Sequence, residues 1–164
     1  MATDGISKAD WRAIKRIAAA IANATSRDDE RAAVHGTSKL LGLLERLEHK
    51  YGRNASLLAT KADYVESNRE RIKLLLQAYT IALRGEDKLN VVLICSSLTE
   101  LYLEKKGHFA EVEKWLARLE QSVGAHPDDE ERRMLSCLRR RLSVKRQKEK
   151  GKVSERGQLM YAHA

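Results

Sequence analysis

Apolar residues recur along this chain at intervals of three and four positions, which is the spacing of one face of an α-helix. The pattern predicts seven helices, separated by short breaks rich in glycine, asparagine and acidic residues. The clearest apolar face consists of Phe109, Val112, Trp115, Leu116, Leu119 and Val123. Strong helix formers dominate the composition, and Pro127, predicted at the first position of the seventh helix, is the one proline. We therefore predict an all-α fold.

Short polar signals predict where several of these helices begin. Ser7 and Asp10 have the spacing of a capping box, in which each side chain accepts a hydrogen bond from a free amide of the first turn. Asn54 and Asn90 are predicted to cap the third and fifth helices. Gly36 lies inside the second predicted helix, where we expect a weakened or kinked point because glycine is a poor helix former.

The apolar period ends near Lys145, and this sets the predicted domain organisation. The length of 164 residues fits one domain, so we predict a single all-helical domain at 1–146 and a basic, flexible tail at 147–164. The chain starts without a signal-peptide pattern, and its apolar runs are too short to span a bilayer. We expect a cytoplasmic protein that does not bind membranes.

The central part of the chain contains an internal repeat. A shift of 38 residues superimposes Tyr64 on Tyr102 and Leu74 on Val112, and also aligns the pairs Ala78 with Leu116 and Ile81 with Leu119. Each repeat then consists of a helix, a short turn and a second helix. Because such a hairpin cannot bury its apolar faces alone, hairpins of this kind stack against their neighbours.

Within the second repeat, Leu98, Tyr102, Gly107 and Phe109 occur in the order that marks a tetratricopeptide hairpin. Residues 54–124 therefore resemble the tetratricopeptide-repeat family, although the turn is one residue longer than the family pattern and Val112 replaces the usual alanine. The resemblance implies a right-handed stack of about three antiparallel helical hairpins. The seventh helix would then cap the end of the stack.

The resemblance also implies a function and a place for it. In that family the first helices of successive hairpins line a groove that holds a peptide, so a non-enzymatic protein-interaction module (an adaptor, chaperone or regulator) is expected. The glutamates among the candidates favour a basic or apolar partner segment. By position, the groove candidates are Leu58, Ala62, Val65, Glu66, Ser96, Glu100, Leu103 and Glu104.

Positive charge is concentrated near the C-terminus. The net charge is +8, and residues 132–156 hold eleven basic and two acidic residues, a local net of +9. This segment is either a solvated helix face or a surface for phosphates or acidic proteins, so the alternative function is that of a nucleic-acid-associated protein. The candidate basic patch is Arg132, Arg133, Arg139, Arg140, Arg141, Lys145, Arg146 and Lys148.

No pattern of catalytic or metal-binding residues is found in the sequence. The histidines lack the spacing of a zinc site, and there is no nucleophile frame, so we expect no enzyme activity, no metal and no cofactor. Cys95 and Cys137 are predicted to be small buried apolar side chains. Self-association into a homodimer through an open end of the stack is a further hypothesis.

Overall fold

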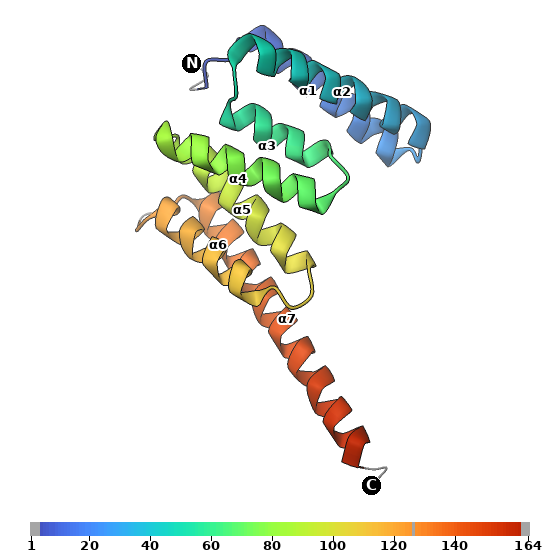
Figure 1. Cartoon of the computed structure of the whole chain (residues 1–164), viewed down its shortest axis with the longest axis vertical. Helices are drawn as coiled ribbons and strands as arrows, with labels where there is room; N and C mark the ends of the chain where they lie inside the picture. Colours follow the sequence, from blue (N-terminus) through green and yellow to red (C-terminus); the bar gives the residue numbers. More distant parts are fainter. Residues whose placement is uncertain (1–3, 126, 162–164) are drawn as a thin grey trace. The chain divides into compact units, whose positions relative to one another are not determined.

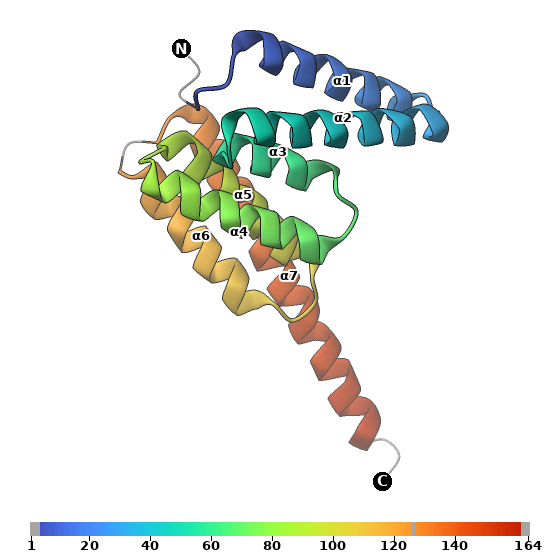
Figure 2. The same ribbon diagram turned by 45° about the horizontal axis from the view of Figure 1, so that its top comes forward.

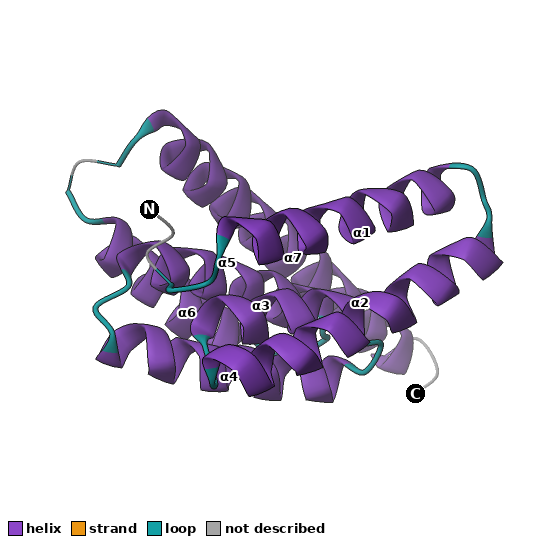
Figure 3. Cartoon of the chain, turned by 90° about the horizontal axis from the view of Figure 1, so that it is seen from above, coloured by secondary structure: helices purple, strands orange, loops and turns teal. Residues whose placement is uncertain are grey.

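A computed structural model describes the backbone of residues 4–125 and 127–161, and the side chains of these residues as far as Glu149. Within them the chain forms seven α-helices and no β-strand (Figure 3). The helices are α1 (Lys8–Ser26), α2 (Glu30–Tyr51), α3 (Ala55–Tyr64), α4 (Asn68–Arg84), α5 (Lys88–Glu104), α6 (Phe109–Val123) and α7 (Asp129–Tyr161) (Figure 1). The predicted all-α fold is confirmed. Among the described helices, none combines the length and the apolar character that crossing a membrane requires.

The chain divides into two compact units, residues 1–94 and residues 95–164, with the boundary inside α5. In the first unit α1 packs against α2, α2 against α3, and α3 against α4 (Figure 2). In the second unit α6 packs against α7. The successive helix pairs α1–α2, α3–α4 and α5–α6 are joined by short turns, which is compatible with a helical repeat.

The core of the first unit forms where α1, α2 and α3 meet. Leu40, Leu44 and Leu47 of α2 are buried against Ile14 of α1 and Leu57 of α3. The three leucines are spaced by four and three residues, so they occupy one face of α2. Burying each leucine contributes about 1.5–3 kcal/mol to the stability of the fold.

Gly36 lies within an unbroken α2, contrary to the expected weak point. The reason is the close approach of the neighbouring helix, since an added Cβ at Gly36 would lie 2.7 Å from Cγ1 of Ile21 in α1. Glycine at this position therefore makes room for the packing of α1 on α2, and the packing compensates for its poor helix propensity.

Two of the predicted helix caps have different outcomes. The Asn54 side chain accepts a hydrogen bond of 2.8 Å from the amide of Ser56, which confirms it as the cap of α3. Asn90 is wrong as the cap of α5, because its own amide donates to Oδ1 of Asp87 at 3.1 Å. Asp87 is therefore the capping residue. The side-chain Nδ2 of Asn90 donates to Oγ of Ser56 at 2.9 Å, which links α5 to α3.

Of the two hydrogen bonds that the predicted capping box of α1 requires, one is formed. The amide of Asp10 donates to Oγ of Ser7 at 3.1 Å, but the amide of Ser7 donates to the hydroxyl of Tyr51. Asp10 turns instead toward the end of α2, where its Oδ2 accepts from Nζ of Lys50 at 2.8 Å and from the Tyr51 hydroxyl at 2.6 Å. One carboxylate thus ties the first turn of α1 to the last turn of α2.

These contacts predict an acid-sensitive element in the α1–α2 hairpin. Hydrogen bonds from Lys50, Tyr51 and Ser7 lower the pKa of Asp10 from 3.8 to about 2. A carboxyl whose pKa is lower in the folded state stabilises the fold above pH 3.8 and loses that contribution as the pH falls toward 2. We expect Asp10→Asn to remove part of the pH dependence of unfolding in this window, measured by denaturant titrations from pH 6 to pH 2. An unchanged pH dependence would show that the carboxylate has no such role.

The second unit contains Leu98, Gly107 and Phe109, three of the residues on which the predicted tetratricopeptide resemblance rests. Gly107 lies in the turn between α5 and α6 with φ of +75°, a left-handed conformation in which side chains are strained. Val112, Trp115 and Leu119 of α6 are buried, as the apolar pattern predicted. Leu98 of α5 and Leu138 of α7 are also buried in this unit.

The start of α7 is fixed by a reciprocal capping box. The amide of Glu131 donates to Oδ1 of Asp128, and Oε2 of Glu131 accepts from the amide of Asp128. Pro127 consequently lies before the helix and not at its first position. α7 continues to Tyr161, runs antiparallel to α6 and extends past the first turn of α6 (Figures 1 and 2). The domain boundary at residue 146 and the flexibility of 147–164 stay predictions.

Candidate functional site

In the first unit, the predicted groove residues differ in accessibility. Leu58 and Ala62 are buried in the unit, Val65 is half-buried and Glu66 is exposed. α3 ends at Tyr64, so Val65 and Glu66 lie in the turn that follows it and not on the helix, contrary to their predicted place.

In the second unit, part of the predicted groove is covered by the chain itself. Leu103 is buried and Ser96 is half-buried, whereas Glu100 and Glu104 are exposed. Oε1 of Glu100 accepts a hydrogen bond of 3.1 Å from Nη1 of Arg141 in α7. The glutamate that was expected to attract a basic partner thus binds a basic side chain of the same unit.

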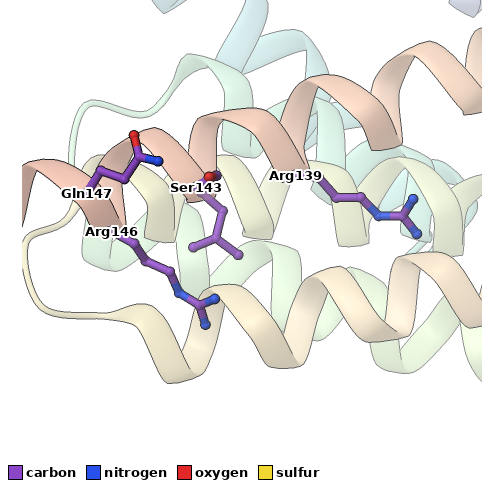
Figure 4. Close-up of a pocket in the computed structure, with 5 residues that line it drawn as sticks. Arg139, Ser143, Arg146 and Gln147 are labelled. Atoms are coloured by element: carbon purple, nitrogen blue, oxygen red, sulfur yellow. The ribbon is translucent and has the colours of Figure 1, made fainter.

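α7 is also held against α6 by two ion pairs. Nη2 of Arg139 lies 2.7 Å from Oε1 of Glu120, and Arg146 pairs with Glu113. The two arginines are seven positions apart on α7, and the two glutamates are seven positions apart on α6. Seven residues are close to two helical turns, so both ion pairs lie on the same side of each helix. Figure 4 shows Arg146 reaching from α7 toward α6. A shallow hollow on α7 is lined by Arg139, Leu142, Ser143, Arg146 and Gln147.

A lysine of α7 binds the end of α5. Nζ of Lys145 donates to the backbone carbonyl of Leu103 at 2.6 Å and to that of Lys105, and it lies 5.6 Å from the centre of the Phe109 ring. The last carbonyls of a helix lack partners within it and carry partial negative charge, so a cation is favourable there. Lys145 therefore satisfies the C-terminus of α5.

The predicted basic patch consequently separates into two groups. Arg139, Arg141, Lys145 and Arg146 contact α5, α6 or the turn between them, while Arg132 pairs with Asp129 in its own helix. Arg133, Arg140 and Lys148 are exposed, and within the described part of the chain they form no ion pair. Arg133 donates to the backbone carbonyl of Asp129 in its own helix. These three cations form what we call the outward stripe of α7.

Several exposed leucines were not recognised from the sequence. Leu76 and Leu83 follow the apolar spacing of the fourth helix, but the buried face of α4 consists of Leu74, Leu75, Ala78 and Ala82. The sequence does contain a sign of these exposed leucines. Besides the buried face, α4 has a second apolar stripe spaced by four, three and four residues, and one packing partner cannot cover both. This stripe consists of Ile72, Leu76, Tyr79 and Leu83. Leu89 and Leu93 at the start of α5 are exposed as well.

The two cysteines differ in environment. Cys95 is buried, and desolvation raises the pKa of its thiol to about 11. Cys137 is exposed, contrary to the prediction, because α7 packs through Leu135, Leu138 and Leu142 and leaves position 137 on the other side.

This difference predicts selective thiol labelling. The thiolate is the reactive form, so at pH 8 a thiol reagent is expected to modify one thiol of the folded chain, Cys137, and two in denaturant. Cys137→Ser should abolish labelling of the folded chain. Rapid modification of two thiols under native conditions would contradict the burial of Cys95.

Comparison with known proteins indicates no family for this chain. No family model matches the sequence, and neither a curated protein nor a solved structure shows significant similarity to it.

Proposed function

We propose that this chain is a protein-interaction module without enzymatic activity, an adaptor, chaperone or regulator built as a right-handed tetratricopeptide-like stack. The repeated helix pairs and the left-handed Gly107 in the α5–α6 turn support this architecture. Among the predicted groove residues, Glu66 is exposed in the first unit and Glu104 in the second, and each by itself suits a basic partner segment.

The observation that carries the proposal is a concentration of exposed leucines in the first unit. Leu76 and Leu83 of α4 are 39% and 51% exposed, and Leu89 and Leu93 of α5 are 65% and 52% exposed. Single exposed apolar residues are common on protein surfaces, but these leucines come in pairs, seven positions apart on α4 and four positions apart on α5, so each pair lies on one side of its helix. Exposed apolar pairs of this kind suit a surface that another molecule covers. Burying such side chains in an interface supplies much of the binding energy that a protein partner requires.

The test compares partner capture by three forms of the full-length chain. Wild type is compared with Leu89→Ser/Leu93→Ser and with the control Val34→Ser, which changes an equally exposed residue of α2 that is 62% exposed. Captures are made from nuclease-treated lysate and quantified by mass spectrometry. A protein retained by wild type and by the control, but lost at least about tenfold by the double variant, supports the proposal.

Two other outcomes are informative. Sedimentation of the purified chain shows whether the partner is a second copy, since a dimer that the same double variant dissociates would identify homodimerisation. Equal recovery of every captured protein by all three forms would contradict the use of these leucines as a binding surface.

A further inference from the structure

Some of the positive side chains of α7 are paired within the second unit, and others are not. Between Arg132 and Lys148 the sequence has eight basic residues and no acidic residue. Among the described residues, the carboxylates that form ion pairs with this segment are Glu100, Glu113 and Glu120 from α5 and α6, together with Asp129 at the start of α7. They neutralise Arg141, Arg146, Arg139 and Arg132, and Lys145 is bound to backbone carbonyls.

The cations left over share one face of the helix. Arg133, Arg140 and Lys148 are separated by seven and eight residues, so they project from the side of α7 opposite Leu135, Leu138 and Leu142. At a rise of 1.5 Å per residue the outward stripe is about 22 Å long. Ser136, Ser143 and Gln147 are exposed near it and add neutral hydrogen-bonding groups.

We propose that the outward stripe of α7 binds the phosphate backbone of a nucleic-acid duplex without reading its sequence. A length of about 22 Å covers roughly six base pairs along the axis of a duplex, where each strand carries one phosphate charge for every 3.4 Å of axis. Three cations at this spacing, flanked by hydroxyl and amide groups, match the groups that contact phosphates. This binding is separate from the proposed protein interaction, which uses leucines of the first unit.

The composition of the stripe favours this partner over other anionic ones. An interface with an acidic protein needs large apolar or aromatic anchors, and the large apolar residue exposed on the described part of α7 is Val144 alone. A membrane-surface helix would need a free apolar face, but the leucine face of α7 is buried. A single strand is bound by stacking on aromatic rings, and residues 127–149 contain no aromatic residue.

The test is duplex binding by the full-length chain, measured by fluorescence anisotropy with 20-base-pair DNA and RNA duplexes over a range of salt concentrations. The variant Arg140→Gln/Lys148→Gln lowers the net charge from +8 to +6. The control Lys15→Gln/Arg16→Gln removes the same charge from exposed positions of α1. Each phosphate contact contributes about 0.9 to the slope of log affinity against log salt.

We expect the stripe variant to reduce the magnitude of that slope by about 1.8, because two phosphate contacts are lost. At about 0.1 M salt its affinity for the duplex should fall by about 50-fold, while the affinity of the control stays near that of wild type. Equal losses in both variants would overturn the proposal, because binding would then follow total charge. Tighter binding to a single strand than to the duplex would also overturn the proposal. So would binding to anionic vesicles or polyglutamate without binding to a duplex. Absence of duplex binding at low salt would overturn it as well.

Discussion

Leu138→Ala is expected to destabilise the second unit by about 2–5 kcal/mol. Leu138 is 1% exposed and lies at the middle of the buried leucine face of α7, between Leu135 and Leu142. Removing most of its side chain loses apolar burial and leaves a cavity that the surrounding helices cannot fill completely. The ion pairs of α7 cannot replace this contribution, because exposed pairs are worth about 0.2–1 kcal/mol each.

The measurement is urea unfolding of the full-length chain in a Trp11→Phe background, in which Trp115 of α6 is the remaining tryptophan and reports on the second unit. Val144→Ala is the matched control, since Val144 is on the same helix but 44% exposed, and it should change stability by less than about 0.5 kcal/mol. If both substitutions had the same small effect, packing of α7 through its leucine face would be excluded.

Two glycines of α2 are expected to respond in opposite directions to substitution by alanine. Gly42→Ala adds a methyl group whose nearest neighbour is Nη1 of Arg46 at 3.9 Å, so it should stabilise α2 by about 0.5–1 kcal/mol through helix propensity. Gly36→Ala brings the same gain, but its Cβ would lie 2.7 Å from Cγ1 of Ile21. Because overpacking costs about 1–3 kcal/mol, Gly36→Ala should be less stable than Gly42→Ala by that amount.

Hydrogen exchange followed by mass spectrometry can localise this difference. Gly36→Ala is expected to speed exchange in α1 and α2, whereas Gly42→Ala slows it, and other helices of the chain serve as internal references. Equal stabilisation by the two alanines would show that α1 adjusts freely around position 36, and that the close approach has no energetic consequence.

The glutamate at position 100 illustrates how far the site was predictable. Its place in the predicted groove came from the tetratricopeptide resemblance, and its attraction for basic side chains from its charge. The structure supplies such a side chain in Arg141, 41 residues later. The sequence could not identify that partner, because periodicity relates residues within one helix and does not relate one helix to another. For the same reason, the division of the basic patch into bound cations and an outward stripe was not predictable.

Local interactions explain what the sequence determined by itself. The seven helices, the capping roles of Ser7 and Asn54, and the turn at Gly107 depend on residues a few positions apart, and a helix is specified over that range. Tertiary structure alone decided that Asp10 is bound by Lys50 and Tyr51, that Gly36 admits Ile21, and that Leu89 and Leu93 stay exposed. These features depend on which helix faces join, and that choice is made by the burial of whole apolar faces rather than by any short segment.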